Sequence, residues 1–138
     1  MEQYHGTNSI SANLISSGKI DVNIGGGELG KGFYTGDLKF QAFIWAWHQY
    51  KQDKSVVILN FNDDDFLQLK PLCLNLLETQ GHRRHIRYTG KTRTFEFNQN
   101  VVWAPVVGRE CQNFNQIKFE SLASQAFLND VNVNKFIL

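Results

Sequence analysis

Two short stretches near the N-terminus hold the side chains best suited to chemistry: "YHGT", residues 4–7, and "LGKGFYTGD", residues 29–37. The imidazole of His5, the exposed backbone of Gly6 and the hydroxyl of Thr7 supply three different hydrogen-bonding groups at the end of a predicted strand. Around Tyr34, glycines such as Gly32 leave the phenol ring free of neighbouring side chains, which suits stacking on a planar group. Together the stretches predict a socket for a small polar ligand with a flat ring.

Plainer interpretations stand beside this one. His5 on its own is compatible with a structural polar residue in a strand, and Tyr34 with a core aromatic residue. A phosphate-binding loop is disfavoured, because "GGGELGKG" does not complete the G-x-x-x-x-G-K-[ST] pattern and leads through Phe33 into a strand rather than a helix.

Composition indicates an ordinary soluble globular protein. The 138 residues fit one domain, 1–138, with 42% hydrophobic residues, 20% charged residues and a net charge of +1. No apolar run approaches the roughly 18 residues of a membrane-spanning helix, and "MEQYHGTNSI" lacks the features of a signal peptide, so we expect a cytoplasmic protein without a membrane partner. Cys73 and Cys111 are isolated, which predicts no metal site and two free thiols, with Cys111 the more exposed.

The first half of the chain predicts alternating short elements. A strand over 2–7 precedes a helix that Ser9 or Ser11 caps and Gly18 ends. A glycine-rich loop over 21–37 contains a short strand "FYT". Next come a helix over 38–52, apolar nearly all round and therefore expected to be mostly buried, and a β-branched strand over 55–62.

The second half predicts mainly strands. Asp63 to Asp65 are placed to cap a helix that Pro71 can break, and the basic segment 81–93, with His82 and His85 at the surface, predicts an exposed hairpin or loop. Helices early and strands late indicate an α+β fold. The remaining predicted elements are strands over 94–98, 101–108 and 114–121, a helix over 122–130, and an edge strand or tail over 133–138.

These motifs carry a resemblance to a known family. "YHGT", "LISSGKI" and "LGKGFYTGDLKFQAFIWA" resemble, in order and spacing, the signature of ADP-ribosyltransferases of the diphtheria-toxin and poly(ADP-ribose) polymerase branch, the H-Y-E class. "VVWAPVVG" and "NQIKFES" are similar to late strands of small bacterial members, so the likeness covers roughly residues 3–60 and 100–125. It implies an ADP-ribosyltransferase-like split β-sheet core of two packed, antiparallel-rich sheets with flanking helices, and NAD⁺ as the substrate.

The resemblance also implies roles for individual residues. His5 would bind a ribose hydroxyl of NAD⁺, Gly6 the nicotinamide carboxamide through its backbone, and Thr7 the adenosine-side ribose. Tyr34 would stack on the nicotinamide, with Trp45 on its other side. Gly32 completes the implied NAD⁺-binding set, whereas Ala42 stands where the polymerases have a carboxamide-binding serine.

The third catalytic position departs from the family. The catalytic triad implied here is His5, Tyr34 and Gln116, with a glutamine in place of the family's glutamate. Hydrogen bonds to charged groups contribute about 1.5–3 kcal/mol against about 0.5–1.5 for neutral ones, so loss of the charge costs on the order of tenfold in rate or more. Glu120 would lie about 13 Å along the strand, too far for the same ribose. Glu28 in the glycine-rich loop is the better reserve acid, and Glu96 the other.

Two functions remain open from the sequence. One is a mono-ADP-ribosyltransferase or NAD⁺ glycohydrolase, acting as a toxin or effector with an antitoxin or immunity partner. The other is a catalytically weak module that binds NAD⁺ or ADP-ribose. The acceptor is a protein, a nucleic acid, a small molecule or water. The basic residues of segment 81–93 predict a solvated hairpin, a contact to the NAD⁺ pyrophosphate or a patch for an acidic acceptor.

Overall fold

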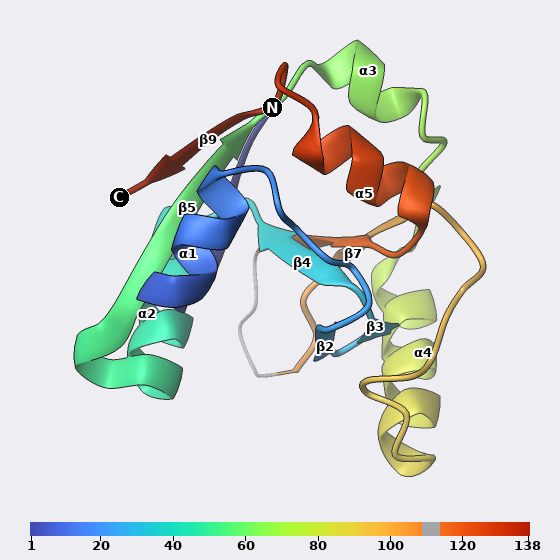
Figure 1. The fold of residues 1–138 in the computed structure, drawn as a ribbon. Helices are drawn as coiled ribbons and strands as arrows, with labels where there is room; N and C mark the ends of the chain where they lie inside the picture. The colour runs from blue at the N-terminus through green and yellow to red at the C-terminus, as the bar shows by residue number, and fades with distance from the viewer. Residues whose placement is uncertain (109–113) are drawn as a thin grey trace.

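The fold is built on one large, mixed β-sheet. The computed structural model describes residues 1–108 and 114–138, so the prediction for Cys111 lies outside the described residues. Seven strands follow the order β6-β7-β8-β4-β1-β5-β9, and all neighbours are antiparallel except β6 and β7 (Figure 1). The strands are β1 (Glu2–Asn8), β4 (Phe33–Gly36), β5 (Lys54–Asn60), β6 (Leu72–Cys73), β7 (Val101–Pro105), β8 (Asn115–Phe119) and β9 (Asn134–Ile137), and β2 (Gly26–Gly27) and β3 (Gly30–Lys31) form a separate hairpin.

Helices cover both faces of this sheet. They are α1 (Ser9–Ser16), α2 (Lys39–Tyr50), the 3₁₀ turn η1 (Lys51–Asp53), α3 (Asp63–Leu67), α4 (Leu76–Tyr88) and α5 (Leu122–Asn129). In Figure 1, α1 lies in front of β5 and α2 behind it. The mixed α+β class predicted from the sequence is confirmed. We expected two packed sheets in the core. Instead, the seven core strands join in a single sheet.

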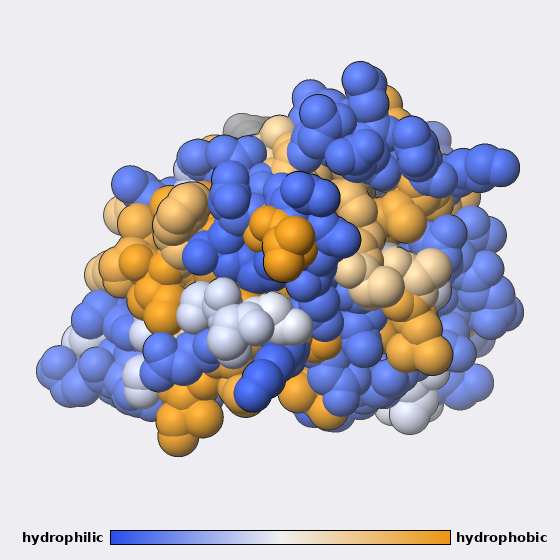
Figure 2. Space-filling model, turned by 45° about the horizontal axis from the view of Figure 1, so that its top comes forward, coloured by the Kyte–Doolittle hydropathy of each residue, from blue (hydrophilic) through white to orange (hydrophobic). Residues whose placement is uncertain are grey.

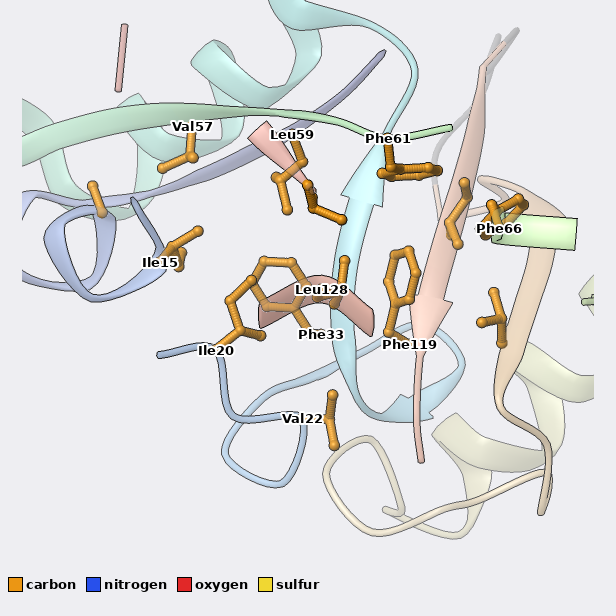
Figure 3. Close-up of a cluster of buried hydrophobic side chains, with 14 residues drawn as sticks. Ile15, Ile20, Val22, Phe33, Val57, Leu59, Phe61, Phe66, Phe119 and Leu128 are labelled. Carbon is orange, nitrogen blue, oxygen red and sulfur yellow. The ribbon is translucent and has the colours of Figure 1, made fainter. Parts of the chain in front are cut away.

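The main hydrophobic core fills one face of the sheet. Phe33 and Phe119 point from β4 and β8 into it (Figure 3), and Ile117 of β8 belongs to the same buried cluster, over which helices close. Burial of large apolar side chains of this kind is the dominant stabilising contribution to folding. The other buried members of the cluster are Ala12, Ile15, Ile20, Val22, Val57, Leu59, Phe61, Phe66, Val101, Leu128 and Val133. A smaller cluster on the opposite face contains Leu29, Leu74, Val102 and Ala104.

Helix α2 forms where it was predicted, but the prediction that it is mostly buried is wrong. Among its residues only Ala46 is fully buried. The ammonium groups of Lys51 and Lys54 lie over the Trp47 ring, and Lys54 also lies over Phe43, so cations rather than core residues cover these aromatic faces. Figure 2 shows one face of the molecule, on which hydrophobic residues stand in separate patches among hydrophilic ones.

Segment 81–93 does not form the predicted hairpin or loop over most of its length. Helix α4 runs to Tyr88 because Asn75 and Glu78 form a capping box at its start, and Ile86 is buried beneath it. The predicted helix that Pro71 can break is divided around this proline: α3 ends at Leu67, α4 begins at Leu76, and β6 lies between them. Residues 94–98 form no strand.

Helix starts use asparagine where serine or aspartate was expected. The side chain of Asn8 caps α1 by accepting from the Ser11 backbone N–H at 2.8 Å, and Asn62 caps α3 by accepting from Asp65. Asp63 to Asp65 occupy the first turn of α3, where negative charge favours the helix dipole. As predicted, Gly18 ends α1, with a left-handed φ of 77°.

Helix α2 packs closely against β1 at Gly6, and this contact yields a stability prediction. A Cβ at Gly6 would lie 2.2 Å from the Ala42 carbonyl oxygen, so the Gly6→Ala substitution forces the helix off the strand. We expect a loss of about 3 kcal/mol in the free energy of unfolding, measured by urea denaturation. Gly81→Ala is the matched control: a Cβ there meets nothing within 4 Å, and we expect a gain of about 0.5–1 kcal/mol from helix propensity. Equal effects of the two substitutions would contradict the close contact.

Candidate functional site

The sheet opens between β1 and β4. These strands pair at Tyr4 and Gly36 alone, whereas β1 pairs with β5 along its whole length. Opposite Gly6, the Val56 carbonyl accepts from the Leu138 backbone N–H on the far side of β5. Because hydrogen-bonding direction alternates along an antiparallel strand, the N–H and C=O of Gly6 then point away from β5 and into this opening.

His5 reaches across the opening with its side chain. Its Nδ1 lies 2.6 Å from the Tyr34 carbonyl oxygen, and its ring stacks on Phe33 at a centroid distance of 4.3 Å. A carbonyl oxygen only accepts, so Nδ1 carries the proton and Nε2 of the neutral ring is left as an acceptor. Burial lowers the pKa of His5 to about 4, although the bond to the Tyr34 carbonyl opposes that shift. His5 is therefore neutral at pH 7.

Tyr34 is engaged by its own glycine-rich loop. Its hydroxyl donates to the Gly30 carbonyl at 2.6 Å and accepts from the Leu29 backbone N–H at 3.1 Å. A Cβ on Gly27 would lie 2.8 Å from the ring, so Gly27 covers one ring face and the prediction of a ring uncovered by its own chain is wrong for that face. Burial raises the pKa of Tyr34, which keeps the phenol protonated. A planar ligand has to stack on the ring face turned away from Gly27.

Gln116 meets the carboxylate of Glu28. The Gln116 Nε2 donates to Glu28 Oε1 at 2.8 Å and to the Pro105 carbonyl at 3.2 Å, and the Val107 backbone N–H donates to the same Glu28 oxygen at 3.0 Å. Gln116 pairs with Gly36 in β4, so its side chain shares a sheet face with that of Tyr34. The structure therefore brings the reserve acid Glu28 onto Gln116, at the end of the sheet face that carries Tyr34.

A buried ion pair holds the loop that carries Glu28. The Lys118 Nζ donates to the Leu29 carbonyl at 2.7 Å and to Glu120 Oε1 at 2.6 Å, and both charged side chains are buried. Glu120 also accepts from the backbone N–H groups of Phe97 and Gln99. Glu120 is thus a structural partner of Lys118 and not a second acid beside Gln116. Sequence reasoning missed Lys118, although the alternation of polar residues at 116, 118 and 120 placed all three on one strand face.

Other predicted site residues lie apart from these contacts. Gly32 is buried against the Lys118 side chain, because a Cβ would lie 2.7 Å from Lys118 Cγ, so it serves packing rather than ligand contact. Trp45 is half exposed and packs edge-on against Tyr50, and within residues 1–108 and 114–138 it makes no aromatic contact with Tyr34. Thr7 is buried in β1, where its side chain points to the same face as that of His5.

Comparison with known proteins adds no family. No family model and no curated protein matches this chain. Within the described parts of the chain, no cluster of three or more His, Cys, Asp or Glu could hold a metal ion, and no helix is long and apolar enough to cross a membrane. Cys73 is an exposed free thiol.

The lowered pKa of His5 predicts a pH-dependent stability. The unfolded chain binds a proton at His5 below its ordinary pKa of 6.5, whereas the folded chain does so only near pH 4. Stability from this residue is therefore complete above about pH 6.5 and is lost as the pH falls towards 4, by at most about 3 kcal/mol. Urea unfolding between pH 7.5 and 4 should show this component in the wild type and not in His5→Gln. Identical pH profiles would contradict it.

Removal of Lys118 should destabilise the fold strongly. Lys118→Met leaves Glu120 buried without its cation, which costs about 3–5 kcal/mol in the free energy of unfolding. The matched control is Lys118→Met combined with Glu120→Gln, whose neutral amide oxygen still accepts a backbone hydrogen bond. Denaturant unfolding should show a smaller loss for the double variant, and an equal or larger one would argue against a compensated ion pair.

Proposed function

We propose that this chain binds NAD⁺ at the opening between β1 and β4 and cleaves the bond between nicotinamide and ribose. The observation that carries the proposal is the Glu28 carboxylate, held by Gln116 on the sheet face that Tyr34 shares. It supports the proposal because it brings a negative charge beside Gln116, the position at which the resemblance to the H-Y-E class implies a glutamate.

Three other groups support the binding of NAD⁺. The backbone N–H and C=O of Gly6 point into the opening, where they match the acceptor and donor of a carboxamide. The unprotonated Nε2 of His5 suits a hydroxyl donor such as that of a ribose. Tyr34 also packs against the smaller cluster that contains Leu29 and Leu74, so the nicotinamide would stack on the part of the ring that neither Gly27 nor this cluster covers. Each of these groups is fixed by a contact of its own and needs little reorganisation to receive a ligand.

The reaction breaks the bond from the ribose C1 to the nicotinamide nitrogen, and the bonding electron pair leaves with neutral nicotinamide. Positive charge develops on the ribose, where the Glu28 carboxylate stabilises it. A nucleophile, either water or a group on an acceptor molecule, then bonds to C1 and releases one proton. The products are nicotinamide and ADP-ribose, free or attached to the acceptor.

A second function has an observation in its favour. The Gln116 amide and the Tyr34 hydroxyl are both satisfied within the chain, by Glu28 and Pro105 in one case and by Leu29 and Gly30 in the other. A module that binds NAD⁺ or ADP-ribose without cleaving it is consistent with these closed contacts.

Nicotinamide release from labelled NAD⁺ tests the role of Glu28. The wild type should release nicotinamide, and Glu28→Gln should lower the rate tenfold or more, because a charged interaction is replaced by a neutral one. Glu96→Gln is the matched control, since it removes a carboxylate that pairs with Lys31, and it should leave the rate unchanged.

Two further variants test where the charge must lie. Gln116→Glu, which from the sequence alone should restore the missing charge, would place a second carboxylate against Glu28, so we expect little or no gain. Combining Glu28→Gln with Gln116→Glu moves one charge from the loop to the strand and should recover part of the activity that Glu28→Gln loses. Saturable NAD⁺ binding without release would favour the binding module, and absence of binding to NAD⁺ and ADP-ribose would contradict both functions.

A further inference from the structure

Helix α4 borders a groove whose lining is strongly basic. The groove has a volume of about 620 Å³, and one helical face supplies most of its wall through positions 80, 83, 84, 87 and 88. Its lining residues are Gln80, Arg83, Arg84, Arg87, Tyr88 and Val107. We propose that this groove binds single-stranded nucleic acid, with the arginines on phosphates and Tyr88 stacked on a base.

The charge of the groove is uncompensated within the described residues. The ion pairs among the described residues join the N-terminal amine to Asp63, Lys31 to Glu96 and Lys118 to Glu120. None of them includes Arg83, Arg84 or Arg87. Glu78, the single acidic residue of α4, is engaged at the helix start, where it caps the backbone of Asn75. Three guanidinium groups in one groove favour a partner with repeated negative charges.

Tyr88 distinguishes nucleic acid from other polyanions. The residue is 92% exposed, which is unusual for a large aromatic residue, and it lines the same groove as the arginines. Base stacking on an exposed aromatic ring contributes to single-strand binding whatever the base, while a stretch of acidic side chains has no planar group for the ring. Bases inside a duplex are already stacked on one another, so the groove favours single strands.

The groove also adjoins the candidate site. Val107 forms part of its wall, and the backbone N–H of Val107 donates to Glu28 Oε1 at 3.0 Å. Arg83 is close enough for its charge to lower the pKa of Tyr34, against the larger effect of burial. A single-stranded nucleic acid bound along α4 would thus have its end or its bases near the Glu28 carboxylate. The binding proposal itself does not depend on NAD⁺.

Fluorescence anisotropy with a labelled single-stranded oligonucleotide tests the groove. The Arg84→Gln/Arg87→Gln variant should bind at least tenfold more weakly and show a shallower dependence on salt, because two phosphate contacts are lost. Tyr88→Ala should weaken binding about tenfold, and Tyr88→Phe should keep most of the affinity because the ring is retained. Lys19→Gln/Lys39→Gln is the matched control: it removes the same charge from exposed positions elsewhere and should have little effect.

Several outcomes would overturn the proposal. They are no binding, equal weakening by the groove and control variants, stronger binding of a duplex, and binding of poly-glutamate as tight as that of the oligonucleotide. An unchanged affinity for Tyr88→Ala would also overturn it. All variants alter exposed helix or loop positions, and their thermal unfolding midpoints show whether the fold is kept. Oligonucleotide affinity is measured without NAD⁺, so its result is separate from that of nicotinamide release.

Discussion

The arrangement of the candidate site depends on a lysine buried beneath the glycine-rich loop. Lys118 joins β8 to that loop through the Leu29 carbonyl, and through Glu120 it joins β8 to the backbone of Phe97 and Gln99. Burial lowers the pKa of Lys118, and the contacts with Glu120 oppose that shift. The charged lysine persists in the interior because these partners replace the water that it loses.

This anchoring explains the composition of the loop. A loop tied to the sheet interior at Leu29 has to pass close to other chain segments, and its glycines lie where it does so: Gly30 against Phe95, with a φ of 91°, and Gly27 against the Tyr34 ring. The glycines therefore let the loop fit its own protein, whereas from the sequence they suggested room for a ligand. With Leu29 held by Lys118 and by the Tyr34 hydroxyl, the adjoining Glu28 is positioned to meet Gln116.

The sequence correctly predicted those helices and strands whose structure is determined by the residue pattern of the segment itself. The β-branched run of β5 and the cap-to-glycine span of α1 are of this kind. Helix α4 escaped prediction because few of its residues face the core and its basic residues suggested a solvated loop, although its capping box was readable. In segment 94–98 the aromatic alternation is that of a strand, yet the Phe95 carbonyl accepts from the Lys31 N–H and from Lys118. Such long-range partners leave no local pattern.

The pairing of Gln116 with Glu28 changes what a glutamine at this position means. From the sequence, Gln116 stood for a lost acid, because a neutral side chain replaces a charged one. In the fold its amide is a donor that holds a carboxylate, a contact that a glutamate there could make only when protonated. A glutamine is thus the better residue for a strand position facing a loop-borne acid. Glu28 also accepts from the backbone N–H of Val107, which lines the α4 groove. Under the proposed function, the carboxylate therefore joins the NAD⁺ site to the groove proposed to bind single-stranded nucleic acid.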